Sequence, residues 1–157
     1  MTTCEPILLE SNDGLHPDYP LPDLEDPIMR PFWDGARQGK LMLQRERHTG
    51  RLHWPPKPLY WREAELEWFE ASGFGTVFSY VIAYEPFLPA FRHRLPMVLA
   101  IVETDEGARL VTYIVNCPPE QVHFGMPVRV VFERLNDAVV LPVWAPAGRE
   151  GQGPTHD

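Results

Sequence analysis

The sequence predicts a mainly β protein, built around a small five-stranded barrel of the OB type that follows an N-terminal helix. From residue 66 onward, segments of alternating apolar and polar residues recur at short spacing, separated by glycine, proline, asparagine and aspartate. Such spacing is typical of small barrels and sandwiches. Proline occurs 18 times in 157 residues, more than twice the usual share of ~5%, which favours short elements and many loops. A β sandwich remains the alternative.

The N-terminal part predicts an extended arm over residues 1–24 and a helix within residues 25–40. The arm contains four prolines and shows no periodicity, so we expect it to order only against a partner. Asp26 offers an N-cap carboxylate, Pro27 fits the first helical position, and Gly39 fits the C-cap. One apolar helical face spans about 28–38; it consists of Ile28, Met29, Phe32, Trp33 and Ala36.

Strand signals fill the rest of the chain. Residues 41–65 predict a hairpin with short strands at 41–47 and 51–54, which prolines end. Residues 66–147 predict the barrel domain, and residues 148–157 a flexible tail. The turn at Asp105-Glu106-Gly107 is a strong hairpin signal. Strands of the barrel domain are expected at 66–73, 75–85, 97–104, 108–115, 127–134 and 139–146.

Composition excludes several classes of protein. Hydrophobic residues make up 44% of the chain, enough for one ordinary globular domain. Two cysteines, Cys4 and Cys117, are too few for a disulfide framework or a four-thiolate zinc ribbon. No run approaches the ~18 apolar residues of a membrane helix, and the N-terminus lacks the basic and apolar regions of a secretory signal. We therefore expect a cytoplasmic protein.

Charge is distributed in three blocks. The net charge is −8, which disfavours nucleic acid as a partner because phosphates attract Lys and Arg. Residues 30–62 nevertheless carry eight basic and two acidic residues, a local charge of +6, between two blocks of −7 each. This segment is either a surface for an anionic ligand or a solvated surface balanced by its acidic flanks.

No motif in the sequence builds an active site by itself. There is no glycine-rich phosphate loop, nucleophile elbow or HExxH pattern. Each histidine stands alone, whereas a catalytic base needs an orienting partner. Cys117 lies between a predicted strand and two prolines, where we expect a small buried apolar side chain rather than a nucleophile. No catalytic residue is therefore assigned.

The loop before residue 97 combines aromatic and cationic side chains. Aromatic residues and arginine are enriched at interface hot spots, and the same mixture suits a ligand with an acyl chain and an anionic head. In the alternative interpretation, Phe87 and Phe91 simply close the open end of the barrel. The loop contains Phe87, Phe91, Arg92, His93 and Arg94.

The order of several segments resembles domain-of-unknown-function family thirty-five (DUF35). These are PFWDGARQGKLMLQRERHTGRLHWPPKPLY, LEWFEASGFGTVFSYVIAY, PAFRHRLPMVLAIVETDEGARLVTYIV, GMPVRVVFE and LPVWAPAG, together spanning roughly 27–147. The resemblance implies an N-terminal helix, a rubredoxin-like zinc ribbon and a C-terminal OB fold. It also implies association with thiolase-like, and in some members hydratase-like, enzymes that act on acyl-CoA.

The ribbon departs from the family pattern. The family reads approximately LQRCxxCGR and PPRPxCPxC, with four zinc-binding thiolates, so the resemblance implies a degenerate, metal-free ribbon over 41–65. A substitute set of Glu46, His48, His53 and Glu63 does not follow the spacing of the two knuckles. The four replaced ligand positions are Glu46, Thr49, Tyr60 and Glu63.

Losing zinc removes a large folding contribution from a segment too small to bury its own core. We expect an aromatic cluster to replace it, because aromatic side chains bury large areas, with help from pairs of Arg45 or Arg62 with Glu46 or Glu63. The candidate aromatic residues are Trp54, Tyr60, Trp61 and Trp68.

The resemblance implies a non-catalytic accessory subunit of a thiolase-like, acyl-CoA-processing complex in lipid, steroid or polyketide metabolism. The partner would carry out acyl transfer or retro-aldol cleavage, and this chain would stabilise it and shape the acyl or CoA passage. We expect no covalently bound cofactor, no zinc and no membrane or nucleic-acid partner, and a CoA thioester at the shared interface. The expected contact residues are Phe32, Trp33, Phe87, Phe91, Arg92, His93 and Arg94.

Two alternatives remain open. One is a stand-alone OB module that binds single-stranded nucleic acid through stacking aromatics and a basic groove. The other is an independent acyl-CoA hydrolase or transferase.

Overall fold

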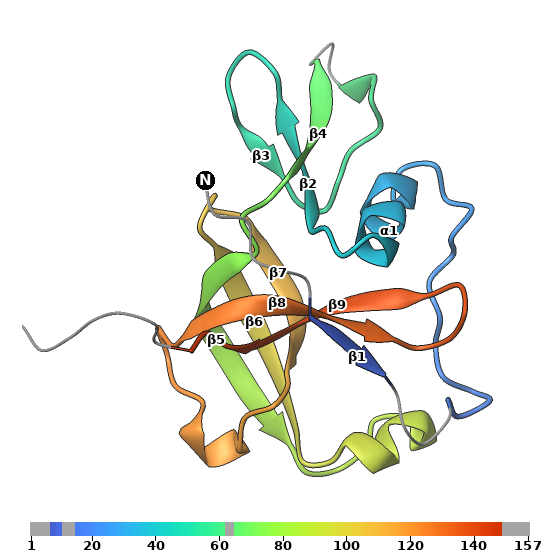
Figure 1. Ribbon diagram of the computed structural model, residues 1–157, viewed down its shortest axis with the longest axis vertical. Coiled ribbons are helices and arrows are strands. Elements are labelled where there is room, and N and C mark those ends of the chain that lie inside the picture. Colours follow the sequence, from blue (N-terminus) through green and yellow to red (C-terminus); the bar gives the residue numbers. More distant parts are fainter. Residues whose placement is uncertain (1–6, 11–14, 62–64, 149–157) are drawn as a thin grey trace, which may run out of the picture.

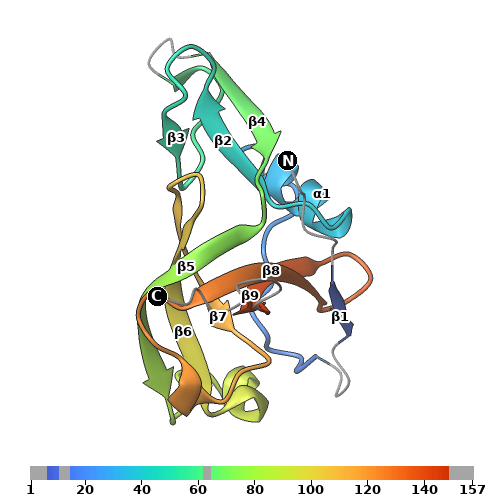
Figure 2. The ribbon, with the colours of Figure 1, turned by 60° about the vertical axis from the view of Figure 1, so that its left-hand side comes forward.

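Two separate β sheets lie one above the other, with a helix beside the junction between them (Figures 1 and 2). The computed structural model describes residues 7–10, 15–61 and 65–148. The upper sheet has three strands, two of which come from the segment expected to be a degenerate ribbon, residues 41–65. The lower sheet forms the barrel. In the described part of the chain, no helix has the length and apolar character needed to cross a membrane.

The lower sheet closes into the expected five-stranded OB barrel. Its strands follow one another in space as β5, β6, β7, β9 and β8, and β8 returns to β5 by pairing Pro127–Arg129 with Phe74–Thr76. The strands are β5 (Phe74–Ala83), β6 (Met97–Thr104), β7 (Arg109–Ile114), β8 (Pro127–Arg134) and β9 (Val140–Pro146). The fold prediction is therefore confirmed, and the sandwich alternative is not.

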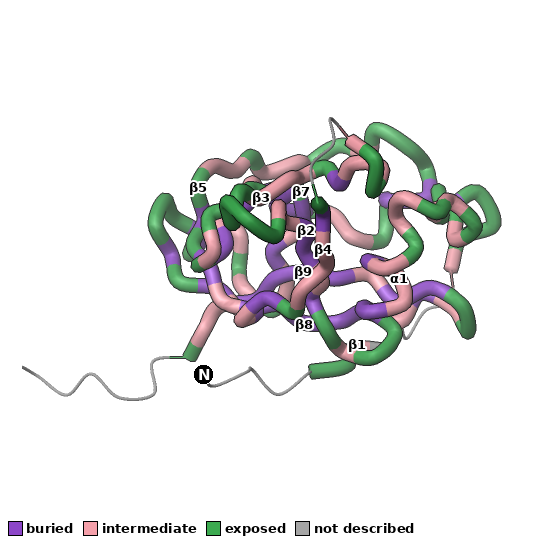
Figure 3. Tube along the Cα trace, turned by 90° about the horizontal axis from the view of Figure 1, so that it is seen from above, coloured by how far each residue is buried: buried purple, intermediate pink, exposed green. Residues whose placement is uncertain are grey.

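The barrel interior is filled because its strands alternate between buried and exposed residues. In β6 this places Val98, Ala100 and Val102 inside, and Trp144 of β9 is 1% exposed. Figure 3 shows the buried positions concentrated along the barrel strands and the exposed ones at the turns. Gly75 lies where β5 approaches β6, because a Cβ atom there would lie 2.5 Å from the carbonyl oxygen of Glu103.

The upper sheet differs from the sequence expectation in one respect. It consists of β2 (Met42–Glu46), β3 (Leu52–His53) and β4 (Leu66–Glu70), in the order β3-β2-β4. The sequence places β4 at the start of the barrel, yet it pairs with β2 along its whole length. The chain turns after β4 at Gly73, which has a φ of 83°, so β4 and β5 enter different sheets.

Helix α1 (Arg30–Arg37) is shorter at its start than expected. The Asp26 carboxylate accepts a hydrogen bond from the Ile28 N–H at 2.9 Å, so it caps the turn before the helix rather than the helix itself. Pro31 takes the early helical position that the sequence gives to Pro27. Gly39 follows the helix with a φ of 72°, as expected for a C-terminal glycine.

The described part of the N-terminal arm packs on the barrel of the same chain. Strand β1 (Leu8–Glu10) runs parallel to β8 and pairs with Phe132–Arg134. Residues 15–24, which we call the strap, then pass beside the barrel towards α1 (Figure 1). Short 3-10 helices also lie at Pro89–Arg94 and Pro119–Gln121. The predicted flexible tail lies outside the described residues, apart from Gly148.

Candidate functional site

The outer face of β5, β6 and β7 presents several exposed apolar side chains, and the guanidinium of Arg109 lies 3.8 Å from the centroid of the Phe78 ring. Three of its side chains are largely exposed: Phe78 at 48%, Val81 at 60% and Val111 at 79%. Leu99 and Ile101 of β6 lie between them and are half-buried. Scattered apolar residues are ordinary on a protein surface, but a contiguous apolar patch marks an interaction site. We call this the sheet face.

The connection from β5 to β6 extends the apolar surface. Tyr84 is 70% exposed and Phe87 is 58% exposed. Phe87 rests on the buried Phe91, with ring centroids 4.7 Å apart. Both Arg92 and His93 are exposed on the 3-10 helix that follows. The loop therefore presents an aromatic group and two potentially cationic groups to solvent.

Other predicted contact residues lie inside the protein. Phe32 is 5% exposed and Phe91 is 3% exposed, so both serve packing, which corrects their assignment as contact residues. Phe32 contacts Trp33 and Trp54, each at a ring-centroid distance of 5.0 Å. Trp33 is half-buried and lines a cavity. Of the predicted set, only Phe87, Arg92, His93 and part of Trp33 are accessible.

Arg94 is also a structural residue. Its guanidinium forms a bidentate ion pair with the Glu133 carboxylate, from Nη1 to Oε2 at 3.1 Å and from Nη2 to Oε1, and both side chains are nearly buried. It lies over two tyrosine rings, 5.6 Å from the centroid of Tyr19 and 5.7 Å from that of Tyr113. Burial raises the pKa of the Tyr19 phenol to about 12, and it also raises the pKa of Tyr113.

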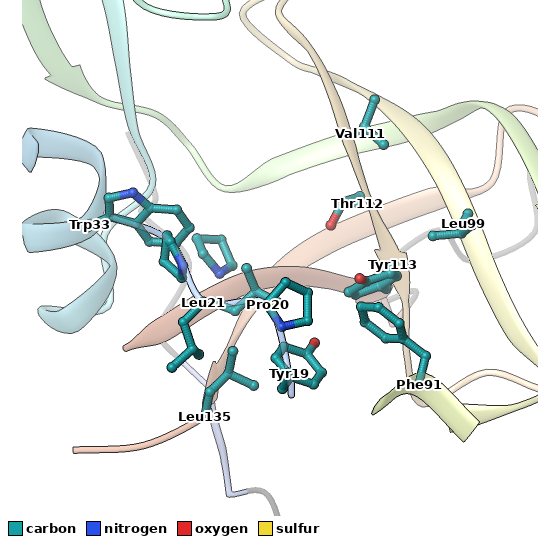
Figure 4. A pocket seen from close by; sticks show the side chains of 13 residues that line it. Tyr19, Pro20, Leu21, Trp33, Phe91, Leu99, Val111, Thr112, Tyr113 and Leu135 are labelled. Atoms are coloured by element: carbon teal, nitrogen blue, oxygen red, sulfur yellow. The ribbon is translucent and has the colours of Figure 1, made fainter. Parts of the chain in front are cut away.

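A cavity of about 400 Å³ lies between the strap, α1 and the barrel (Figure 4). The strap contributes Tyr19–Pro22 and the helix contributes Trp33. The lining is mostly apolar and aromatic, as is usual for small-molecule sites. From the rest of the chain it includes Phe91, Leu99, Val111, Thr112, Tyr113, Leu135, Leu141 and Pro142.

Glu46 and Thr49, two of the residues expected at former ligand positions, hydrogen-bond to each other. The Glu46 carboxylate accepts a hydrogen bond from Thr49 Oγ1 at 2.6 Å and lies 2.9 Å from His53 Nε2. These contacts lower the pKa of Glu46, and the bond from Thr49 is the largest cause. Among the residues that the structure describes, no cluster of three His, Cys, Asp or Glu side chains could hold a metal ion. Glu63 lies outside those residues.

The buried side-chain amide of Gln44 hydrogen-bonds to the backbone of Lys57. Gln44 is 1% exposed, and it accepts a hydrogen bond from the Lys57 N–H at 2.7 Å while donating one to the Lys57 carbonyl at 2.8 Å. The expected aromatic cluster forms only in part. Trp54 and Trp68 pack against the core, whereas Tyr60 is 85% exposed.

The expected ion pairs of the ribbon also differ. Arg45 pairs with Glu67 at 2.9 Å, not with Glu46, because they face each other across β2 and β4. Arg62 lies outside the described residues. The pairing Gln44–Lys57 carries no local sequence signal, and it is the interaction that the sequence analysis missed.

Carboxylates of the same chain neutralise much of the basic segment. Each pair is exposed or half-exposed and therefore contributes little stability, but it reduces the positive field available to an anionic ligand. The pairs are Arg30 with Glu25, Arg37 with Asp34, and both Arg45 and Arg47 with Glu67.

Cys117 is only partly buried, whereas the sequence predicts a buried apolar side chain. The burial that it has raises the pKa of its thiol. A protonated thiol is a poor nucleophile.

Comparison with known proteins identifies relatives over most of the chain. A family model described as "ChsH2, C-terminal OB-fold domain" matches residues 68–133. The chain is 36% identical over 119 residues to a "DUF35 domain-containing scaffold protein" of Methanocaldococcus jannaschii, covering 73% of this chain and 83% of that protein.

Two longer relatives are named as hydratase subunits. The chain is 39% identical over 119 residues to a "Probable enoyl-CoA hydratase alpha subunit" of Thermomonospora curvata, covering 74% of this chain and 37% of that protein. It is 36% identical over 138 residues to the "3-oxo-4,17-pregnadiene-20-carboxyl-CoA hydratase alpha subunit" of Mycobacterium tuberculosis, covering 80% and 43%. The chain thus spans about two fifths of the length of these relatives.

A solved structure has the same fold. The chain named "Ltp2-ChsH2(DUF35) aldolase" superposes with a TM-score of 0.70 at 33% sequence identity, covering 80% of this chain and 98% of that chain.

Proposed function

Because this chain belongs to the DUF35 family of OB-fold proteins, we propose that it is a non-catalytic accessory subunit of a thiolase-like, acyl-CoA-processing complex. The observation that carries the proposal is the sheet face, where Val81 and Val111 present largely exposed apolar surface beside Phe78, whose ring Arg109 covers on one side. Burying such a surface against a partner removes it from water, which is the main driving force of association.

The names of the relatives support an acyl-CoA complex. Two are alpha subunits of acyl-CoA hydratases, and the related structure is named as an aldolase of Ltp2 and ChsH2(DUF35). In our proposal the partner enzyme carries the catalytic groups, for acyl transfer or for retro-aldol cleavage. This chain stabilises the partner and forms one wall of the passage for the acyl group.

The loop beside the sheet face suits the CoA end of such a substrate. Phe87 supplies an exposed apolar surface, and the neighbouring Arg92 and His93 are exposed. The paired arginines of the ribbon have carboxylate partners, so Arg92 and His93 are the better candidates for CoA phosphates. A CoA thioester would then bind at the shared interface rather than to this chain alone.

Co-expression with a thiolase-like enzyme of the same genome, followed by size-exclusion chromatography, tests the proposal. We expect co-elution. Val111→Asp should weaken the complex by at least about tenfold, because a carboxylate buried in an apolar interface is costly. Leu59→Asp is the matched control, since Leu59 is 64% exposed on the ribbon, away from the sheet face. Separate elution of the two wild-type proteins, with unchanged activity of the enzyme, would count decisively against the proposal.

A further inference from the structure

We propose that the free edge of β7 binds an extended segment of the partner enzyme as an added strand. The segment carries an acidic residue opposite Arg109 and an apolar residue opposite Val111, and it has no proline at these two positions. This inference rests on the proposed function, because it names the part of the partner that binds beside the sheet face.

The seam of the barrel between β7 and β9 opens at Pro142. The two strands run parallel and pair only at Ile114 with Trp144, where the Val115 N–H donates to the Trp144 carbonyl at 2.8 Å. Along β9, every second residue turns its N–H towards β7, so the residue in line to donate to the Val111 carbonyl is Pro142. Proline has no N–H, and the ladder therefore ends there.

The backbone groups of Arg109 and Val111 point towards this open seam. At the start of β7, the Ala108 carbonyl accepts a hydrogen bond from the Thr104 N–H at 2.8 Å, and the register between β6 and β7 continues this pairing at Leu110. In an antiparallel pair, alternate residues turn their N–H and C=O groups to opposite sides. Arg109 and Val111 therefore direct these groups away from β6.

The strap covers the seam without pairing with β7. A cavity of about 400 Å³ separates Tyr19–Pro22 from Val111–Tyr113, and Figure 4 shows Pro20 and Leu21 on one side of it and β7 on the other. Consecutive strand residues line this cavity, so it runs along the edge of β7 rather than over one face. Free strand edges bind extended segments through main-chain hydrogen bonds.

The side chains along the edge indicate what the segment carries. The Nε of Arg109 donates to the Glu103 carboxylate at 2.8 Å. A guanidinium carries several N–H donors, and this contact engages Nε alone, which leaves the others for an acidic residue directly across from Arg109. Val111 is 79% exposed and favours an apolar residue beside it.

A second copy of this chain fits the edge less well than a different protein. Strand β7 has the sequence RLVTYI, which offers no acidic residue to the Arg109 of another copy. The net charge of −8 also disfavours self-association, because like charges repel. The partner enzyme is therefore the better source of the added strand.

Hydrogen exchange of the co-expressed complex, resolved to single amides, tests the added strand. We expect the amides of Arg109 and Val111 to exchange about tenfold more slowly, or slower still, in the complex than in the isolated chain, since they gain hydrogen bonds there. The Leu110 amide faces β6 already and should change far less. A complex that forms without slowing the Val111 amide would overturn the inference.

Variants of Val111 separate the backbone from the side chain. Val111→Pro removes the outward N–H at an edge position, which tolerates proline, and should weaken the complex by about tenfold. Val111→Thr keeps the N–H and the branched shape, and should weaken it by less than about threefold. Thermal melts verify that each variant folds.

Glu70→Pro is the matched control, because it places proline on the free edge of β4. The Ala71 N–H donates to the Leu41 carbonyl at 2.8 Å, so the N–H of the neighbouring Glu70 points away from β2. This variant should bind the enzyme as the wild type does.

Charge reversal tests the acidic residue. Arg109→Glu should weaken the complex more than Arg109→Gln, because it repels a carboxylate across from it. Equal weakening in the two variants would overturn this part of the inference.

The outcomes distinguish this inference from the proposed function. Equal affinity of Val111→Pro and Val111→Thr would overturn the added strand and leave the proposed function intact, because the complex would still form. Separate elution of the two wild-type proteins would overturn both. A dimer of the isolated chain that Val111→Pro abolishes would show that a second copy, and not the enzyme, binds the edge.

Discussion

Arg94 and Glu133 form a buried, bidentate ion pair although 39 positions separate them in the sequence. The pair joins the 3-10 helix at Pro89–Arg94 to β8, and Tyr19 of the strap packs over it. Three segments that are distant in the chain thus meet at one charged contact. Their mutual position therefore depends on it.

Removing one partner of this pair should destabilise the protein strongly. Glu133→Ala leaves a buried guanidinium without its counter-charge, and we expect a loss of about 3–5 kcal/mol in the free energy of unfolding. Urea denaturation measures it. The double variant Arg94→Met with Glu133→Leu should recover most of the loss, because apolar residues replace a buried pair well. As a control, Glu103→Ala breaks the exposed pair with Arg109 and should cost less than about 1 kcal/mol. Equal losses in the two alanine variants would contradict the prediction.

The Tyr19 phenol should make stability depend on pH in alkali. Its pKa is about 12 in the folded protein against 10.0 for the free side chain, so the folded state holds this proton more tightly. The ionisation of Tyr19 should therefore give the free energy of unfolding no pH dependence below pH 10.0. The free energy of unfolding should then fall as the pH rises from 10.0 to about 12.

Ultraviolet absorbance of tyrosinate checks this directly. We expect two phenols, Tyr19 and Tyr113, to ionise late in the native protein, and the late signal to decrease by one phenol in Tyr19→Phe. Tyr84→Phe, at a position that is 70% exposed, should leave the late signal in place. Loss of the late signal in the Tyr84 variant rather than the Tyr19 variant would show that burial of Tyr19 is not its cause.

The carboxylate of Glu46 should make the stability of β2 and β3 depend on pH in the acidic range. Hydrogen bonds from Thr49 and His53 lower its pKa from 4.5, so ionised Glu46 stabilises the fold above that pH. The contribution is lost as the pH falls through the lowered value. Glu46→Ala should therefore increase amide hydrogen exchange in β2 and β3 at neutral pH, and the difference from wild type should vanish in acid. Glu65→Gln, which alters an exposed contact with His48, is the control, and equal exchange in both variants at neutral pH would refute the role.

Metal analysis tests whether the segment that contains Glu46, Thr49 and His53 binds zinc. Because Glu46, Thr49 and His53 hydrogen-bond to one another there, we expect protein purified without chelator to contain far less than one zinc per chain. EDTA should leave the melting temperature unchanged. One equivalent of zinc, lost together with a fall in melting temperature, would contradict the prediction.

Gln44 should be the most sensitive single position of the ribbon. Gln44→Ala removes two hydrogen bonds and leaves the N–H and carbonyl of Lys57 without partners, so we expect a loss of about 2–4 kcal/mol. Chemical denaturation measures it. Gln121→Ala, at an exposed position, should change stability by less than about 0.5 kcal/mol. Similar small effects in both variants would show that the Lys57 contacts are not structural.

The barrel strands were predictable because their signals are local. The alternation within 97–104 and 127–134 matches β6 and β8, and the Asp-Glu-Gly turn joins β6 to β7 as expected. The partner of β4 was not predictable, since pairing depends on which strand lies beside it after the turn at Gly73. The contact residues could not be predicted from residue type either, because an aromatic side chain such as Phe91 suits a protein interior and an interface equally.

The cavity beside the strap could not be predicted from the sequence. The strap, α1 and β7 each contribute to the cavity from a different part of the chain. No residue pattern within one of these segments predicts that it lies beside the other two. Thr112 looks like any strand threonine in the sequence. In the folded protein its hydroxyl has no hydrogen-bond partner within the described chain.

The parallel pairing of β1 with β8 has a consequence for the order of folding. Leu8–Glu10 cannot pair until Phe132–Arg134 has formed its strand, so during synthesis the N-terminal residues must wait while nearly all of the barrel is made. Contacts of such large sequence separation form slowly. We expect the barrel to assemble first from its local hairpins and the strap to close over it last, so that the strap is the final segment to gain protection from hydrogen exchange.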